Sequence, residues 1–343
     1  MLMNAMNCIL LVLLLFVSGV TGDQQTIREP KGADNNCVIA LTNFHIPVFT
    51  KPSYANQNTD IEELTFTIPL KRAGKLILIE AVVDGISGNI ILDTGSTSLV
   101  LNSIYFRHGR QQRSLMAGGI TGSTGIISRS RVESMIMSGM HFHDLEADIT
   151  DLGHIEAARN IKVLGFAGLC IFSDFEVVID LHSSVMELHR LDHRGNRLFE
   201  TRKDPNFDIE LPVRIESYIV FIDGVINNRR LTFCLDTGAE SNVLSIHLPN
   251  RVLNTVSITR RSNLSGAGAK QIEVLYGTMD DFSIGKQKFE GMNTIITNLN
   301  AMNHAYGTRI DGMLGCYFLE KGIFHINMKN KSLGIKLIKE DRK

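Results

Sequence analysis

The chain has 343 residues, of which 44% are hydrophobic and 21% are charged, and its formal net charge is −1. This length allows two domains that each bury a core. The near-zero charge excludes the strongly basic proteins that attract nucleic acid through a broad positive field, so we expect no nucleic-acid partner.

The first 22 residues have the pattern of a secretory signal peptide. A hydrophobic run over residues 8–17 is followed by small residues up to Gly22, and charged sequence begins at Asp23. The run is short for a membrane span. We expect residues 1–22 to be removed, which leaves a secreted or periplasmic protein without a membrane anchor. An uncleaved anchor is the alternative.

Residues 23–60 form a polar N-terminal extension with three prolines. This extension either adds edge strands to the fold or serves as a removable pro-segment. After it we expect an N-terminal lobe over residues 61–191, a polar linker over 192–206 and a C-terminal lobe over 207–343.

The two lobes begin with the same order of predicted elements. Alternating or continuous apolar runs predict strands, and Asp-Gly pairs predict the turns between them. In the first half these strands cover residues 64–70, 75–83 and 90–92, and in the second half residues 207–213, 219–222 and 231–235. The third strand leads in each case into an Asp-Thr-Gly triplet. This order indicates an internal repeat of mainly antiparallel β lobes.

The repeat continues beyond the triplets. A glycine-rich patch follows each one, at residues 117–125 and 265–268, and a hydrophobic-hydrophobic-Gly step follows at residues 163–165 and 313–315. Each half closes with a pair of apolar strands. Helical patterns are scarce, and we expect only short helices near residues 103–106 and after Gly315.

The two triplets are the strongest functional signal in the chain. They read Asp93-Thr94-Gly95-Ser96 and Asp236-Thr237-Gly238-Ala239. A single Asp and Gly pair at the end of a strand is most simply a turn, but two copies in matching contexts argue against this. An acid beside a buried strand is costly unless it is hydrogen-bonded.

Two acids from two related lobes can meet and share one proton, because both cannot ionise cheaply at close range. One acid is then a base and the other an acid, which suits the activation of water for amide hydrolysis. We therefore predict that Asp93 and Asp236 are catalytic. Their supporting residues would be Thr94, Gly95, Ser96, Thr237, Gly238 and Ala239.

The fourth position of the triplets differs between the two halves. Ser96 could donate a hydrogen bond to Asp93, whereas Ala239 has no hydroxyl. A missing donor to the ionised form raises the pKa of a carboxyl group. The sequence therefore predicts an activity optimum closer to neutral than that of stomach-type enzymes.

On these motifs, residues 62–338 resemble the aspartic proteases of the pepsin–retropepsin clan. They are most similar to the exported, retropepsin-like bacterial proteins in which two lobes are fused. The resemblance implies an all-β, bilobal fold with two homologous β-barrel-like lobes and a central cleft. It also implies that Asp93 and Asp236 are the catalytic acids. Asp311-Gly312-Met313-Leu314-Gly315 matches the second motif of the family well, while residues 160–165 lack its Asp and its first Gly.

The family covers its cleft with a β-hairpin flap. Gly118, Gly119, Gly122 and Gly125 suit a mobile hairpin at the corresponding place. A plain surface loop is an equally good interpretation of these glycines. No residue in the patch matches the flap tyrosine of pepsins, which retropepsin-type flaps also lack.

Other polar groups give weaker signals. Cys37, Cys170, Cys234 and Cys316 remain after signal removal, and they form disulfides or stay as buried thiols. His141 and His143 share one strand face, but no third ligand stands at a telling spacing, so we predict no metal site. We expect no organic cofactor. Asn263 and Asn330 begin glycosylation acceptor motifs, which matter only in a eukaryotic secretory pathway.

The predicted function is that of an aspartic endopeptidase that acts as a monomer on a peptide or protein substrate.

 The alternatives are a catalytically silent peptide- or protein-binding module on the same fold, and a zymogen that stays silent until residues 23–60 are cut.

Overall fold

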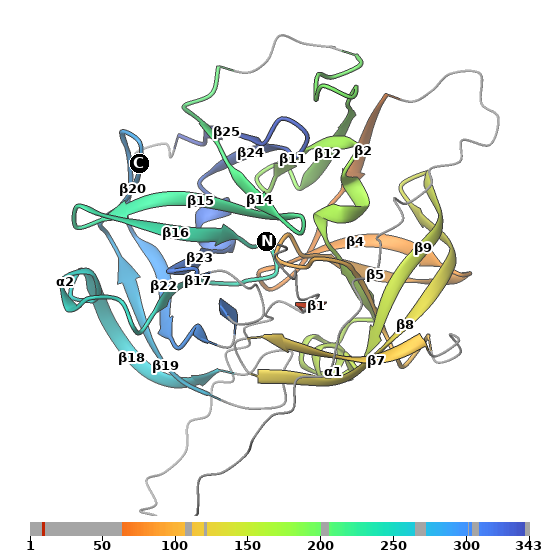
Figure 1. The fold of residues 1–343 in the computed structure, drawn as a ribbon, viewed down its shortest axis with the longest axis horizontal. Coiled ribbons are helices and arrows are strands. Elements are labelled where there is room, and N and C mark those ends of the chain that lie inside the picture. The colour runs from red at the N-terminus through yellow and green to blue at the C-terminus, as the bar shows by residue number, and fades with distance from the viewer. Residues whose placement is uncertain are drawn as a thin grey trace, which may run out of the picture.

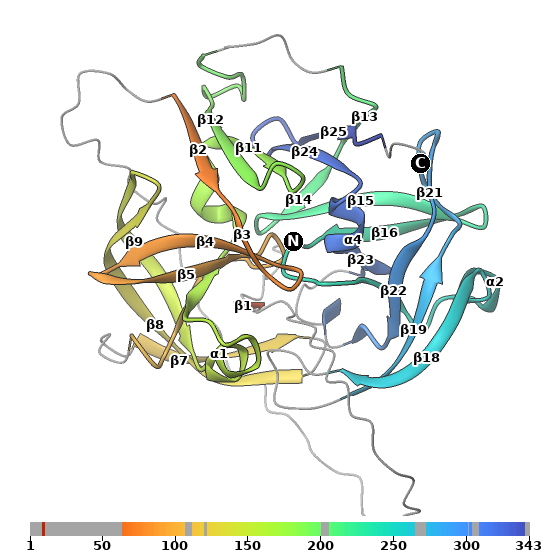
Figure 2. The ribbon, with the colours of Figure 1, turned by 180° about the vertical axis from the view of Figure 1, so that it is seen from behind.

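The computed structural model describes residues 9–10, 64–106, 112–119, 122–199, 206–264, 272–300, 302–303 and 309–339. These residues are mostly β-strand and form two lobes side by side, with a third sheet that joins them (Figures 1 and 2). The predicted extension over residues 23–60, Cys37, and all of the predicted signal peptide except Ile9–Leu10 lie outside the described residues.

The first lobe is built on a nine-stranded sheet in the order β1-β7-β8-β9-β6-β10-β5-β4-β3. An additional pairing of β4 with β8 closes this sheet on itself. Its strands are β1 (Ile9–Leu10), β3 (Lys71–Ala73), β4 (Leu76–Val83), β5 (Ile86–Leu92), β6 (Leu99–Asn102), β7 (Gln112–Gly119), β8 (Gly122–Met137), β9 (Met140–Thr150) and β10 (Val163–Ala167).

The second lobe is built on a ten-stranded sheet in the order β18-β19-β22-β17-β23-β16-β15-β20-β21, with β14 also paired to β15. Its strands are β14 (Arg214–Glu216), β15 (Ile219–Ile226), β16 (Arg229–Leu235), β17 (Asn242–Ser245), β18 (Val256–Leu264), β19 (Ile272–Met279), β20 (Phe282–Ile284), β21 (Gln287–Phe289), β22 (Met292–Thr297) and β23 (Gly312–Leu314). From β18 through β15 to β14, these strands follow the same order as β7 through β4 to β3 in the first lobe. The internal repeat predicted from the sequence is therefore a repeat of strand topology.

A six-stranded sheet joins the two lobes in the order β13-β25-β24-β11-β12-β2. Each lobe contributes three strands, and β11 of the first lobe pairs with β24 of the second. The strands are β2 (Thr65–Pro69), β11 (Phe175–Asp180), β12 (Val185–Arg190), β13 (Ile209–Pro212), β24 (Gly322–Asn327) and β25 (Ser332–Leu337). These are the apolar strands that open and close each half of the sequence.

Matching burial shows why the two halves adopt the same fold. Strands β4 and β15 are both eight residues long, and each is buried at the same six positions along the strand and exposed only at the fifth position. Those fifth positions are Glu80 and Asp223. Apolar side chains on both faces of a strand favour a place inside a sheet that is covered on both sides.

Helices are short, as expected. They are α1 (Gly153–Arg159), the 3-10 helix η1 (Leu169–Phe172), α2 (Asn250–Leu253) and α4 (Cys316–Leu319). The helix predicted after Gly315 is α4. The helix predicted near residues 103–106 is wrong, because the backbone N–H groups of Tyr105 and Phe106 both donate to the Asn102 carbonyl and form only a turn. Among the described residues, no helix has the length and apolar character needed to cross a membrane.

Candidate active site

Each Asp-Thr-Gly triplet begins directly after a buried strand. Asp93 follows β5 and Asp236 follows β16, and neither acid is exposed to solvent. The backbone N–H of Asp93 donates to the Ala167 carbonyl over 2.9 Å, and that of Asp236 donates to the Leu314 carbonyl over 3.0 Å. Each acid is thus fixed to the end of a neighbouring strand, β10 or β23, in its own lobe.

The two threonines join the triplets across the lobes. The Thr94 hydroxyl donates to the Leu235 carbonyl (2.8 Å) and accepts the N–H of Thr237 (3.0 Å). In the reciprocal contacts, the Thr237 hydroxyl donates to the Leu92 carbonyl (2.7 Å) and accepts the N–H of Thr94 (2.9 Å). Four buried hydrogen bonds therefore hold the two loops together.

The glycines let the two carboxyl groups approach. Oδ1 of each acid accepts the N–H of its own glycine, Gly95 at 3.0 Å and Gly238 at 2.8 Å. A Cβ atom on Gly238 would lie 2.8 Å from Cγ and Oδ1 of Asp93, so the Asp93 carboxyl packs directly on the loop of the other lobe. Oδ2 of each acid is buried and accepts no hydrogen bond from the described residues.

Burial controls the ionisation of both acids. It raises the pKa of Asp236 to about 7, although the N–H of Gly238 acts in the opposite direction. Burial also raises the pKa of Asp93, and the nearby charge of Asp236 raises it further. Near neutral pH the pair of acids therefore keeps one proton, which is the arrangement of one acid and one base.

The role predicted for the Ser96 side chain is wrong. Its hydroxyl is buried and donates to the Ser98 carbonyl over 3.0 Å, so it does not donate to Asp93. Only the backbone N–H of Ser96 acts on Asp93, by donating to the Asp93 carbonyl. Ala239 is buried in an apolar cluster at the matching position. The raised pKa values thus arise from burial first, and the difference between Ser96 and Ala239 does not cause them.

The hydrophobic-hydrophobic-Gly step of the first lobe is also shifted from its predicted place. In strand β10, Phe166 and Ala167 pair with Ile91 and Leu92, as Met313 and Leu314 in β23 pair with Cys234 and Leu235. The counterpart of Gly312–Gly315 is therefore Gly165-Phe166-Ala167-Gly168, three residues beyond the predicted segment. The first glycine that seemed to be missing is Gly165.

Close backbone contacts confirm this register. A Cβ atom on Gly165 would lie 1.9 Å from the Val100 carbonyl oxygen, and one on Gly312 would lie 2.4 Å from that of Val243. Similarly, a Cβ atom on Gly168 would lie 2.3 Å from the Ser96 carbonyl oxygen, and one on Gly315 would lie 2.5 Å from that of Ala239. Only glycine fits these four positions without a backbone shift.

The glycine patch of the first lobe is part of a β-hairpin and not an irregular loop. Gly119 pairs with Gly122, Gly118 with Ser123, and Ala117 with Gly125 in the antiparallel strands β7 and β8. In the second lobe, β18 and β19 form the corresponding hairpin. The two hairpins lie on the same side of the molecule with their ends turned toward each other (Figures 1 and 2).

The structure describes three of the four cysteines and both of the neighbouring histidines singled out in the sequence. Cys170, Cys234 and Cys316 are free thiols. The rings of His141 and His143 stack with centroids 6.3 Å apart, and within the described ranges no three His, Cys, Asp or Glu side chains are grouped to hold a metal ion.

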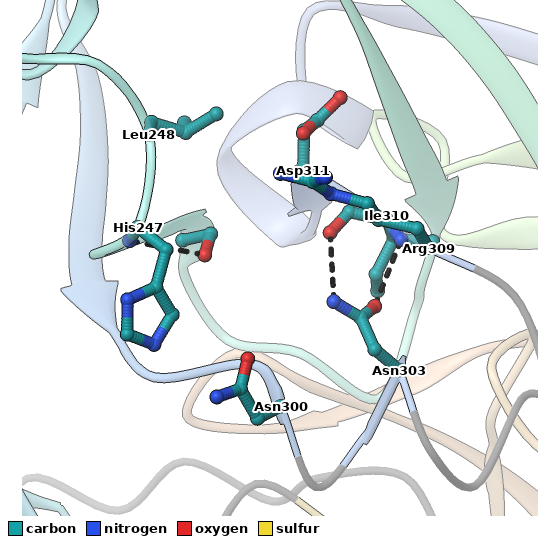
Figure 3. Close-up of a pocket in the computed structure, with 8 residues that line it drawn as sticks. His247, Leu248, Asn300, Asn303, Arg309, Ile310 and Asp311 are labelled. Carbon is teal, nitrogen blue, oxygen red and sulfur yellow. Dashed lines mark hydrogen bonds between the residues drawn. The ribbon is translucent and has the colours of Figure 1, made fainter.

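A cavity of about 440 Å³ lies in the second lobe, between Ser245, Leu248 and the start of β23 (Figure 3). Asn303 lines this cavity. Its side chain accepts the N–H of Ile310 and donates to the Ile310 carbonyl. No residue of either triplet lines this cavity, so it is separate from the paired acids.

Sequence reasoning missed the ion pairs that cross between the lobes. Arg159 of the first lobe pairs with Glu240 of the second, and Arg72 and Lys75 both pair with Glu320. These partners are 81 to 248 residues apart in the chain. No local sequence pattern predicts these pairs. The one available signal is that Glu240 lies two residues after Gly238 of the second triplet, and therefore close to the paired acids.

Comparisons with known proteins match one segment of the chain to a family. Residues 222–318 match a family model described as aspartyl protease. This segment contains Asp236 and the Gly312–Gly315 step. No curated protein matches the chain.

Solved structures of similar shape include an aspartic proteinase from Irpex lacteus, with 13% identity, a TM-score of 0.49, and coverage of 80% of this chain and 97% of that one. Basic 7S globulin from soybean also matches, with 10% identity, a TM-score of 0.47, and coverage of 79% of this chain and 94% of that one.

Proposed function

We propose that the protein is an aspartic endopeptidase in which Asp93 and Asp236 share a proton and activate a water molecule. The observation that carries this proposal is the meeting of two fully buried acids from two lobes, each with one carboxyl oxygen that no described residue uses. Their raised pKa values keep one proton on the pair near neutral pH.

The chemistry follows from this shared proton. Ionised Asp236 accepts a proton from the attacking water, while protonated Asp93 donates its proton to the carbonyl oxygen of the scissile peptide. In the second step, the proton on Asp236 passes to the leaving amide nitrogen, a hydroxyl group of the tetrahedral intermediate returns its proton to Asp93, and the C–N bond breaks. The N–H groups of Gly95 and Gly238 hold the carboxylates in place throughout.

The substrate of this enzyme would be an extended peptide segment. The hairpins β7–β8 and β18–β19 approach each other from the two lobes (Figure 2). Strand edges bind extended peptides through backbone hydrogen bonds. We assign the glycines of the β7–β8 hairpin to a flap that closes over the substrate, and we keep the prediction that the N-terminal hydrophobic run directs the protein to export.

Cleavage of a mixed peptide library tests the proposal. Assayed from pH 3 to pH 8, the parent should be most active toward neutral pH, because the pKa of Asp236 is about 7 and one acid of the pair must be ionised to accept a proton from water. Asp93→Asn and Asp236→Asn should each lower kcat by at least about 10³-fold, since each removes one partner of the shared proton. The measurement is product formation by mass spectrometry.

Three results would count against the proposal. A parent that is inert at every pH, with or without residues 23–60, would favour a binding protein on the same fold. A variant of either acid that keeps full activity would show that the two acids do not act together. A pH profile that peaks below about pH 3 would contradict the raised pKa values.

A further inference from the structure

Glu240 connects the catalytic loop of the second lobe to the first lobe. It lies two residues after Gly238, and its side chain is only 14% exposed. Its carboxylate pairs with the guanidinium of Arg159, the last residue of α1, which is 19% exposed. The ion pair therefore bridges the two lobes immediately beside the paired acids.

The turn before β4 in the first lobe packs closely against Arg159. Arg159 lies against the turn before β4, where a Cβ atom on Gly74 would come within 2.6 Å of Nη1 of Arg159. Gly74 also has a φ of +65°, which favours glycine. Burial raises the pKa of Glu240, while Arg159 and the backbone N–H of the next residue, Lys75, act in the opposite direction. A partly buried charge with an ion-pair partner and a backbone donor is held more firmly than an exposed one.

Among the described residues, the first triplet loop has no counterpart of the ion pair between Arg159 and Glu240. Thr97 occupies the position in the first triplet loop that Glu240 occupies in the second. Threonine cannot form an ion pair, so the described residues hold the two loops differently. The Asp93 loop is tied to the other lobe through Thr94, whereas the Asp236 loop is tied through both Thr237 and Glu240.

We propose that Arg159 is a positioning residue that holds the Asp236 loop against the first lobe through Glu240. This inference rests on the proposed function, because it gives the ion pair a role in placing Asp236 relative to Asp93. A displacement of about 1 Å in a reacting group is enough to cost on the order of 10²-fold in rate. Loss of the contact should therefore lower kcat while KM changes little, since the proposed role of Arg159 is to pair with Glu240 and not to contact the substrate.

The first experiment compares Arg159→Leu with the parent by hydrogen–deuterium exchange and by kinetics. We expect at least tenfold faster exchange in residues 236–244, unchanged exchange in residues 93–101, and a kcat that falls about 10- to 100-fold. Arg159→Lys, which keeps the charge, should stay within about threefold of the parent. Arg131→Leu is the matched control, because Arg131 is 70% exposed and pairs with Asp144 inside one lobe.

The double variant Arg159→Leu with Glu240→Gln separates a positioning role from the effect of an unpaired buried charge. Because the double variant still lacks the ion pair, the positioning role predicts that exchange in residues 236–244 remains fast and kcat remains low. Full recovery would overturn the proposal, as would an Arg159→Leu variant in which both loops loosen equally or neither changes. If Arg159→Leu does not fold, Glu240→Gln alone serves in the same comparison, with the same expected exchange.

The two proposals fail in different ways. A parent that cleaves no peptide rejects the proposed function, and the exchange comparison still decides whether Arg159 holds the Asp236 loop. A parent that cleaves normally while Arg159→Leu leaves kcat and exchange unchanged rejects only the positioning role.

Discussion

At the scale of single residues, the two buried acids have the largest influence on how the protein responds to pH. Asp93 and Asp236 are fully buried, and burial raises the pKa of each. A raised pKa means that the folded state prefers the protonated acid. The stability that this preference contributes is complete below the unfolded pKa of about 3.9 and is lost as the pH rises through the folded pKa.

The folded protein should therefore lose stability between about pH 4 and pH 7. For Asp236, whose folded pKa is about 7, the loss should approach about 1.4 kcal/mol per pH unit. Asp236→Asn removes this dependence, so its melting temperature relative to the parent should rise as the pH rises over this range. Differential scanning calorimetry at pH 4, 5.5 and 7 measures the effect. The exposed acid Asp223 provides the control, since Asp223→Asn should follow the parent, and parallel curves for Asp236→Asn would contradict the prediction.

At the scale of elements, strands β10 and β23 position the two Asp-Thr-Gly loops by passing very close to them. Gly165 in the middle of β10 and Gly168 directly after this strand match Gly312, the first residue of β23, and Gly315 directly after β23. At each of them a Cβ atom would lie within 2.5 Å of a backbone carbonyl oxygen. A backbone atom cannot rotate away as a side chain can, so a larger residue must move the loop that carries the acid.

Gly315→Ala should destabilise the protein by at least about 2 kcal/mol. Its Cβ would meet the carbonyl oxygens of Ala239 and Ser241 at 2.5 and 2.6 Å. Gly139→Ala is the control, because no atom lies within 4 Å of its Cβ and only its φ of +84° is unfavourable, at a cost of about 1 kcal/mol. Urea unfolding followed by circular dichroism measures both variants. Equal losses would show that close approach is not the reason for glycine at position 315.

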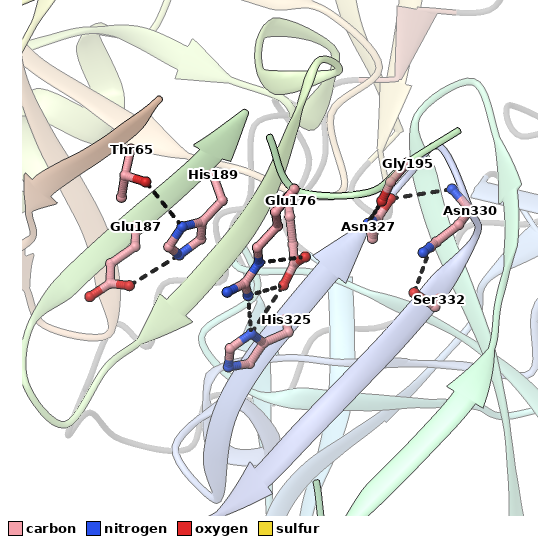
Figure 4. A network of polar contacts seen from close by, with 10 residues as sticks. Thr65, Glu176, Glu187, His189, Gly195, His325, Asn327, Asn330 and Ser332 are labelled. Atoms are coloured by element: carbon pink, nitrogen blue, oxygen red, sulfur yellow. Dashed lines mark hydrogen bonds and ion pairs between the residues drawn. The ribbon is translucent and has the colours of Figure 1, made fainter. Parts of the chain in front are cut away.

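At the scale of the whole molecule, a buried ionic network joins the two lobes and the segment between them. Glu176 of β11 accepts hydrogen bonds from Arg197, at 2.6 and 3.1 Å, and lies 3.1 Å from Nδ1 of His325 in β24 (Figure 4). Burial alone would raise the pKa of Glu176, but the hydrogen bonds from His325 and Arg197 outweigh it and lower the pKa to about 2. Asn327 adds a further bond, from its side chain to the Gly195 carbonyl.

Glu176→Gln should destabilise the protein at pH 7 by about 3 kcal/mol. A lowered pKa contributes stability above the unfolded pKa of about 4.3, and this stability is lost as the pH falls toward 2. The difference between variant and parent should therefore shrink below about pH 4. Urea unfolding at pH 7 and pH 3 measures it. Glu80→Gln is the control, because Glu80 is 69% exposed and its pairing with Lys71 should contribute less than about 1 kcal/mol. A constant difference at both pH values would contradict the prediction.

Much of the fold was predictable because local patterns repeat in the two halves. Apolar runs predicted β4, β5, β15 and β16, and the Asp-Thr-Gly triplets predicted where the two halves meet. The predictions failed where only contacts between distant segments decide the structure. The Ser96 hydroxyl was predicted to donate to Asp93, but in the folded protein it donates to the Ser98 carbonyl. The glycine step in the first lobe was misplaced by three residues, because Val163-Leu164-Gly165 and Phe166-Ala167-Gly168 fit the same apolar pattern.

The sequence by itself determined the order of strands along each half of the chain and the identity of the two paired acids, because strand periodicity and the triplets are local properties of the chain. Only the tertiary structure decided how the acids are held and how they ionise. The pKa values depend on burial, which both lobes create together. The pairing of Arg159 with Glu240 joins residues 81 positions apart, and only the packing of one lobe against the other brings such groups into contact.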